Sequence, residues 1–116
     1  TPMKFKQQHT FEDRKTESDR VIEKYPDRIP VIVERTKKAK VPNIDRNKFL
    51  VPNNLTMGQL VYVIRKRIRI EAEKAIFLFV NKQILCNTST LSEVYARHSD
   101  NDGFLYVEYM EENVFG

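Results

Sequence analysis

The sequence predicts a small α+β fold in which two N-terminal helices precede a mixed series of strands and helices. A threonine followed three residues later by an acidic or amide side chain occurs at Thr10, Thr56 and Thr90, and this pattern begins helices. Short β-branched or apolar runs lie between these sites and end at proline or turn residues. With 116 residues, 41% of them apolar, the chain is long enough for one domain with one core.

The N-terminal part is predicted to be helical. A short helical or loose segment is expected over residues 4–8, and Thr10 then begins a charged helix that runs to about Tyr25. Pro26 ends this helix because proline cannot continue it. We expect residues 1–26 to be an N-terminal helical extension that packs on the core.

Two strands follow the helical extension. Residues 28–35 are β-branched and apolar, and Pro30 is tolerated near the start of such a strand or on an edge. Residues 37–47 form a polar loop, and residues 48–52 form a shorter strand that pairs with the first as a hairpin. Pro52 favours an edge position for this second strand.

Thr56 and Gln59 form the second capping pattern, and a helix that packs on the sheet should follow them. Its apolar residues recur at helical spacing: Met57, Leu60, Val61, Ile64 and Ile68. Its far side is expected to carry Arg65, Lys66, Arg67 and Arg69.

Residues 75–80 (AIFLFV) are short, apolar and β-prone, which predicts a fully buried central strand. The remaining elements are a turn at 81–82, a brief strand at 83–85, a helix from Thr90 to about His98, a turn at 100–103 and an alternating strand over 104–110. This order over residues 27–116 is that of the ubiquitin-like β-grasp fold, with two additional N-terminal helices, and we expect the chain to form a single unit.

Composition narrows the function classes. Cys86 is the only cysteine and His9 and His98 the only histidines, so no internal disulfide forms, no metal site or cofactor is expected, and a cytoplasmic location fits best. Residues 75–80, the longest apolar stretch, are far shorter than the ~20 residues of a membrane-spanning helix.

Charge is distributed unevenly in a chain whose net charge is +4. Residues 1–69 hold 17 Lys and Arg against 8 Asp and Glu, whereas residues 70–116 hold 3 against 8. Such asymmetry indicates either a basic surface for an acidic partner, membrane or nucleic acid, or an ordinary solvated face. Charge alone favours the solvated face.

The last residues, 111–116, read as a short tail that leaves the final strand and ends at Gly116. Glycine has no Cβ, so such a tail can thread a narrow enzyme cleft and present an unhindered carbonyl for transfer to an amine. Any chain can end at glycine, so the tail alone leaves both interpretations open.

Five blocks of the sequence stand out, namely residues 24–34 (KYPDRIPVIVE), 48–52 (KFLVP), 62–68 (YVIRKRI), 75–81 (AIFLFVN) and 102–107 (DGFLYV). In this order and spacing they closely resemble the autophagy-related protein 8 family of ubiquitin-like modifiers, which contains the GABA-type-A receptor-associated protein. The resemblance runs from about Phe5 to Gly116.

The resemblance implies that Gly116, exposed by a processing cysteine protease if the precursor is longer, is activated as an adenylate. Activating and conjugating enzymes of autophagy then carry it as a thioester and join it to the amine of phosphatidylethanolamine. A diacyl lipid anchors a protein stably because each buried methylene contributes ~0.8 kcal/mol and a single chain is marginal. The implied protein is a cytoplasmic monomer that is held on autophagosome membranes when lipidated, and none of its side chains is catalytic.

The resemblance also implies docking of aromatic-x-x-aliphatic peptides from cargo receptors and adaptors, which add as a strand beside residues 48–52. The aromatic pocket would contain Glu17, Val21, Pro30, Lys48, Leu50 and Phe104. The aliphatic pocket would contain Phe49, Val51, Pro52, Leu55, Leu60, Val63 and Ile64. The acidic flanks of the peptide would meet Arg28, Arg46, Lys48 and Arg67.

Each of these residues has a simpler interpretation. Apolar residues such as Leu50 and Phe104 normally pack in a core, and the basic residues 65–69 normally form a solvated face. By resemblance, residues 76–79 would contribute to a second docking surface for ubiquitin-interacting helices, although core packing is favoured there. The resemblance leaves microtubule binding by the basic N-terminal helices undecided.

Four positions depart from the family. Many members have two prolines at Leu85-Cys86, and their loss should loosen that turn. Phe49 replaces a common tyrosine, and Leu60 replaces a common phenylalanine. These two changes predict a shifted partner preference with an unchanged binding mode.

Three other function classes match parts of the sequence. A Cys86–His98 nucleophile pair suggests a hydrolase, but no third group orients it. The basic residues 65–69 suggest a nucleic-acid module, but no RNP-like aromatic motif or zinc spacing accompanies them, so no nucleic acid is expected. A modifier attached to protein lysines shares the fold and the tail and differs only in its amine acceptor.

Overall fold

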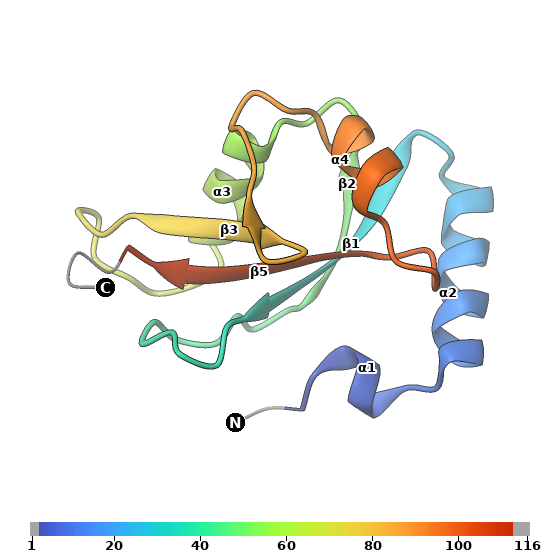
Figure 1. Ribbon diagram of the computed structural model, residues 1–116, viewed down its shortest axis with the longest axis horizontal. Helices are drawn as coiled ribbons and strands as arrows, with labels where there is room; N and C mark the ends of the chain where they lie inside the picture. The colour runs from blue at the N-terminus through green and yellow to red at the C-terminus, as the bar shows by residue number, and fades with distance from the viewer. Residues whose placement is uncertain (1–2, 113–116) are drawn as a thin grey trace.

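The computed structural model describes residues 3–112, which form a five-stranded mixed sheet flanked by helices (Figure 1). The elements in chain order are α1 (Phe5–Gln8), α2 (Phe11–Lys24), β1 (Arg28–Arg35), β2 (Lys48–Pro52), α3 (Met57–Arg65), β3 (Ile76–Val80), β4 (Gln83–Ile84), α4 (Leu91–His98) and β5 (Leu105–Glu111). The strands lie in the order β2-β1-β5-β3-β4, with β1 and β5 parallel and the other neighbours antiparallel. The predicted order of elements is confirmed.

The three threonine caps begin their helices at the predicted residues. The Thr56 and Thr90 hydroxyls accept from the backbone N–H groups of Gln59 and Glu93, whose side chains accept in return from the backbone N–H groups of the two threonines. Thr10 accepts from the Asp13 N–H at 3.1 Å, but no return bond forms within the part of the chain that the structure describes. The capping pattern at Thr10 is only half formed because the aspartate side chain is shorter than that of the Glu or Gln preferred at this position.

The centre of the sheet is formed by β1 and β5. The predicted hairpin is confirmed because β1 pairs antiparallel with β2, and the register places Ile29 opposite Val51. The parallel pairing of β1 with β5 begins only at Val31, opposite Leu105, so Pro30 lies ahead of this ladder and its missing N–H breaks none of its bonds. Pro52 lies in β2 at the edge of the sheet, as predicted.

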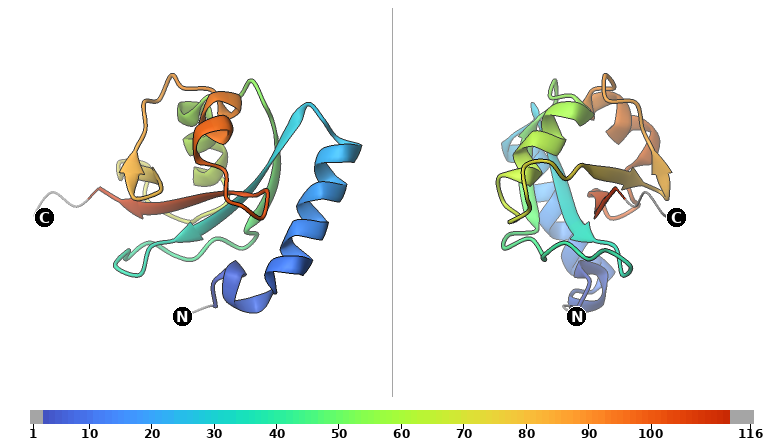
Figure 2. Two further views of the ribbon diagram at one scale, coloured as in Figure 1. Left: turned by 45° about the vertical axis from the view of Figure 1, so that its right-hand side comes forward. Right: turned by 90° about the vertical axis from the view of Figure 1, so that its left-hand side faces the viewer.

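Strand alternation divides the buried side chains between two faces of the sheet. Figure 2 shows α3 and α4 on one side of the sheet and α1 on the other. The larger cluster joins α3 and α4 to one face of the sheet and includes Leu60, Ile64, Leu91, Val31 and Val107. The smaller cluster lies on the opposite face, where α1 brings Phe5 against Ile32, Phe104 and Tyr106. The helix α2 lies across the end of the sheet where β5 begins (Figure 1).

The prediction that residues 75–80 form a fully buried central strand is wrong. Strand β3 lies between β5 and the two-residue strand β4, and its burial alternates. Ile76 and Leu78 face the larger cluster, whereas Phe77 remains 37% exposed on the opposite face. In the described chain, α1 reaches only the smaller cluster on that face, which leaves the side chain of Phe77 partly open to solvent.

Helix α3 ends earlier than its apolar spacing predicts. The helix stops at Arg65, and the backbone then leaves through a turn in which the Arg67 N–H donates to the Ile64 carbonyl at 2.9 Å. The Arg65 guanidinium folds onto the following loop and donates to the carbonyls of Glu71, Ala72 and Lys74. Residues 65–69 are therefore not one face of a helix. None of the helices in the described residues has the length and apolar character needed to span a bilayer.

Candidate functional site

The edge strand β2 presents free peptide groups along the margin of the sheet. The Asn47 carbonyl accepts from the Val33 N–H at 2.8 Å, so Asn47 and every second residue after it direct their peptide groups toward β1. Lys48 and Leu50 consequently direct theirs outward, where β2 has no second strand neighbour within residues 3–112. This margin can accept an added strand through main-chain hydrogen bonds.

The residues predicted for the aromatic pocket gather between β2 and α2. Glu17 on α2 and Lys48 on β2 form an ion pair at 2.6 Å across the gap between the two elements. Leu50 pairs with Pro30 on the sheet and is half-buried, and Phe104 is 2% exposed. Val21 is half-buried one helical turn beyond Glu17. The site therefore has a charged rim and apolar walls.

Apart from Pro52, which shares the face of Leu50, the residues predicted for the aliphatic pocket lie on the opposite face, on or against α3. Val51, Leu60 and Ile64 are core residues, between 0 and 5% exposed. Phe49 and Leu55 are half-buried and pack against this cluster, Val63 is half-buried, and Pro52 is exposed. The buried residues can form only the floor of such a pocket, and the half-buried ones its walls. The functional role of both sets stays a prediction.

The four basic residues predicted to meet acidic flanks surround the margin. Arg28 is exposed at the start of β1, and Arg67 lies 3.8 Å from the exposed Asp45 carboxylate. The Arg46 guanidinium lies 5.9 Å from the centre of the Phe49 ring, and its Nε donates to the outward carbonyl of Lys48 at 3.0 Å. An added strand that bonds to this carbonyl must compete with Arg46.

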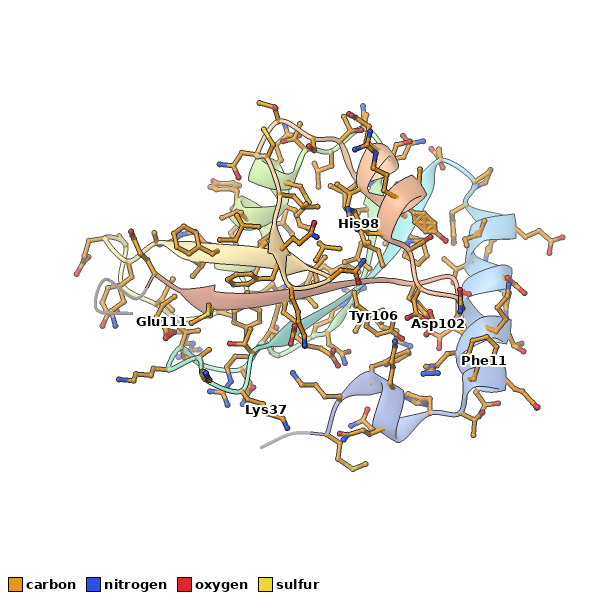
Figure 3. The ribbon with its side chains drawn as sticks, viewed as in Figure 1. Phe11, Lys37, His98, Asp102, Tyr106 and Glu111 are labelled. Carbon is orange, nitrogen blue, oxygen red and sulfur yellow. The ribbon has the colours of Figure 1, made fainter. Side chains whose placement is uncertain are left out.

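A buried polar cluster under α2 was missed by the sequence analysis. Asp102, 0% exposed, lies in the turn before β5, and Figure 3 shows it where this turn meets α2. Its carboxylate accepts from the Phe104 N–H at 2.9 Å and from the Tyr106 hydroxyl, and lies 3.3 Å from Arg14 Nε. The Ser18 hydroxyl donates to the Asp102 carbonyl. Burial, and then the Asp102 carboxylate, raise the pKa of Tyr106 far above its usual value.

The sequence carried a weak signal for this cluster. Arg14 and Ser18 lie one turn apart and are the two buried residues of α2, while the apolar Phe11 stays 47% exposed and lies 5.7 Å from the Arg14 guanidinium. A helix whose inner face is polar has no apolar period to detect. The buried partner Asp102 belongs to a distant turn, so no local pattern links the two.

The suggested nucleophile pair is not assembled. The Cys86 thiol contacts Thr88 Oγ1 at 3.0 Å, and His98 Nδ1 contacts the Asn81 amide at 3.1 Å, and no hydrogen bond among the described residues joins Cys86 to His98. The hydrogen bond with Thr88 lowers the pKa of the exposed Cys86 thiol. Across residues 3–112, no group of three or more His, Cys, Asp or Glu residues is placed to hold a metal ion.

The predicted start of the tail at residue 111 is wrong, because Glu111 still belongs to β5 and pairs with Ile76. The end of this strand is fixed to its surroundings. The Glu111 carboxylate accepts from the backbone N–H groups of Lys40 and Val41, and the Glu112 N–H donates to the Ala75 carbonyl at 2.8 Å (Figure 3). The conjugation site predicted at Gly116 lies outside the described residues.

A mixed five-stranded sheet of this order, with α3 packed across it and helices bordering an open strand edge, defines a ubiquitin-like protein. Residues 13–116 match the sequence model of the family described as autophagy protein Atg8 ubiquitin like. The chain belongs to this family. The resemblance seen in the sequence and the predicted ubiquitin-like fold are thereby confirmed.

Individual relatives agree over nearly the whole chain. Autophagy-related protein 8 of Mycosarcoma maydis is 54% identical over 112 residues, which cover 97% of this chain and 95% of that protein. Autophagy-related protein 8e of Arabidopsis thaliana is 57% identical over 112 residues, which cover 97% of this chain and 92% of that protein. The crystal structure of ATG8 from Trypanosoma brucei matches with a TM-score of 0.91 and 42% identity, covering 100% of both chains.

Proposed function

We propose that this chain is a ubiquitin-like modifier of autophagy that docks aromatic-x-x-aliphatic peptides of cargo receptors and adaptors along β2. The observation that carries the proposal is that β2 is an edge strand whose half-buried apolar side chains Phe49 and Leu50 point to opposite faces of the sheet. In an extended peptide, residues three positions apart point to opposite faces. An aromatic residue can therefore enter the site beside α2 while the aliphatic residue enters the site beside α3.

The charges around the margin support a preference for acidic flanks. Arg28, Arg46, Lys48 and Arg67 lie around β2 and all four are exposed, although Lys48 and Arg67 also form ion pairs. Exposed pairs contribute only ~0–1 kcal/mol each, so these residues set specificity and association rate more than affinity. The binding of a peptide with acidic flanks should accordingly weaken as salt rises, while that of its uncharged version should change little.

Membrane attachment is the second part of the proposed function. Gly116, exposed by a cysteine protease if the precursor is longer, would be activated and conjugated by autophagy enzymes and joined to phosphatidylethanolamine on autophagosome membranes. Family membership supports this chemistry, which resides in the partner enzymes, so we propose that the chain is not itself an enzyme. The protein would be cytoplasmic until lipidated, with residues 1–26 and 27–116 acting as one unit.

Deleting Gly116 separates the two parts. We expect the deletion to abolish conjugation to phosphatidylethanolamine in a reconstituted reaction and to leave peptide affinity unchanged, because the peptide site lies along β2. Intact-mass analysis of the membrane-bound form measures the first, and calorimetry with one aromatic-x-x-aliphatic peptide measures the second. Normal lipid conjugation without Gly116 would refute the lipid assignment. An added mass that corresponds to a protein joined through a lysine, instead of a phospholipid, would refute it as well.

A further inference from the structure

We propose that Asp102 and Arg14 are positioning residues for the aromatic site. Their buried ion pair holds α2 at the distance from β2 at which Glu17 and Val21 border that site. The inference rests on the proposed docking function and adds two residues that lie outside both peptide sites.

The ion pair is held by charge rather than by a directed hydrogen bond. Asp102 is 0% exposed and the Arg14 side chain 10% exposed, and Nε lies 3.3 Å from Oδ2. Neither Nε nor Nη1 of Arg14 has an aligned hydrogen-bond acceptor among residues 3–112. If the charge of Asp102 is removed, a guanidinium stays buried without compensation, which is strongly unfavourable. Outward movement of α2 relieves this because it returns Arg14 to water.

The same carboxylate also fixes the floor of the aromatic site. Its Oδ1 accepts from the Phe104 N–H at 2.9 Å, and Oδ2 faces Arg14 and the Tyr106 hydroxyl. Asp102 therefore links the backbone of Phe104 to the position of α2. Removing the charge of Asp102 while Arg14 stays in place should therefore change the separation of the two borders of the site.

Helical geometry transmits the position of Arg14 to the site. Glu17 and Val21 lie three and seven residues after Arg14, so all three project from one side of α2. Ser18, on the same side, packs so closely on Gly103 that a Cβ there would lie 3.0 Å from the Ser18 Cβ. A displacement of this turn of the helix must carry Glu17 and Val21 with it.

The substitution Asp102→Asn tests the proposal because it keeps the side-chain volume and an acceptor for the Phe104 N–H while removing the charge. We expect affinity for an aromatic-x-x-aliphatic peptide to fall by about 5- to 20-fold. The lost affinity should come from the contacts of the peptide's aromatic residue. Replacing that residue by alanine should therefore weaken binding to Asp102→Asn less than it weakens binding to the wild type. The effect of the same replacement at the aliphatic position should not change.

Nuclear magnetic resonance of the free protein provides a readout that needs no peptide. The backbone amide shifts of Glu17 and Val21 should move in Asp102→Asn, whereas those of Leu55 and Val63 should stay. If the wild-type chain binds no such peptide, the docking function is wrong, and these shifts still decide whether the pair positions α2. Unmoved shifts at Glu17 and Val21 would overturn the positioning role.

Two controls separate positioning from loss of stability. Ile76→Ala creates a cavity in the core next to Glu111, away from α2, and should lower stability. It should keep the aromatic selectivity of the wild type, defined as the loss of affinity when the aromatic residue of the peptide is replaced by alanine. Lys15→Ala removes the exposed Lys15–Asp19 pair of α2 and should change neither. In a generally destabilised chain, the aromatic and the aliphatic residue of the peptide would lose equal parts of their contribution to affinity. That result in Asp102→Asn would overturn the proposal.

A second substitution should restore what the first removes. Adding Arg14→Met to Asp102→Asn eliminates the uncompensated charge, and replacing both partners of a buried pair is often neutral. The double variant should regain the aromatic selectivity. If Asp102→Asn does not fold, Arg14→Gln serves instead, because Asp102 keeps two hydrogen-bond donors, and a wild-type selectivity in that variant would refute the role of the pair.

Discussion

The substitution Gly103→Ala should destabilise the protein through two separate effects. Gly103 has φ +92, a conformation that residues with a Cβ rarely adopt, and forcing alanine into it costs about 1–3 kcal/mol. The new Cβ would also overlap Ser18 Oγ and lie 3.0 Å from Ser18 Cβ. Pushing α2 outward to remove this overlap costs about 1–3 kcal/mol more.

We therefore expect the free energy of unfolding to fall by about 2–5 kcal/mol, which urea denaturation measures directly. Gly58→Ala is the matched control. Its Cβ would meet the Asn87 carbonyl at 3.3 Å, and its place inside α3 favours alanine by about 1 kcal/mol, so its net effect should stay within that range. A loss below about 1 kcal/mol for Gly103→Ala would refute the close approach of α2 to this turn.

A double-mutant cycle separates the two effects. Ser18→Ala removes the hydroxyl that the new Cβ would overlap, but it leaves the positive φ of Gly103 in place. The cost of Gly103→Ala should therefore be smaller by about 1 kcal/mol in the Ser18→Ala background. Strictly additive losses would mean that the backbone conformation accounts for the whole effect.

Two further predictions concern the peptide site and the end of β5. Leu50→Ala should weaken an aromatic-x-x-aliphatic peptide by about 10- to 100-fold in calorimetry while thermal unfolding changes less; matching losses in the two measurements would make Leu50 a core residue only. Desolvation raises the pKa of Glu111, but hydrogen bonds from the N–H groups of Lys40 and Val41 outweigh it and hold that pKa below 4.5. Because the folded-state pKa is the lower one, this stabilisation is full above about pH 4.5 and is lost as pH falls through the folded value. Glu111→Gln should accordingly lower stability at pH 7 and flatten its decline in acid, and an unchanged acid slope would contradict this.

Local chemistry explains which elements could be predicted from the sequence. The three threonine caps mark helix starts to the residue, because the cap side chain bonds the backbone of the same turn. Pro52 predicts the edge position of β2 for a similarly local reason, because proline has no backbone N–H to donate. These signals need no knowledge of the rest of the fold.

Tertiary contacts explain the errors. The alternation of β3 was hidden because its half-open face carries Phe77 and Phe79, which read as core residues. The end of α3 was misplaced because Arg65 turns back to hold the carbonyls of the 71–74 loop, a contact that helical spacing does not encode. Arg14 and Asp102 look like surface charges in the sequence and are buried only because each compensates the other.

Strand β5 connects the two parts of the proposed function. It begins beside Phe104, at the end of the sheet next to α2, and it ends at Glu111 at the opposite end of the molecule (Figures 1 and 3). A protein tethered through the residues that follow Glu111 would hold its α2 end away from the attachment point, where the aromatic site can meet a peptide. Lipid attachment and peptide docking should then be thermodynamically independent, because the proposed aromatic site and the end of β5 lie at opposite ends of the molecule. Equal peptide affinities for the free and the membrane-attached protein are the expected result, and a coupling of more than about 1 kcal/mol between the two events would show that β5 transmits a change between its ends.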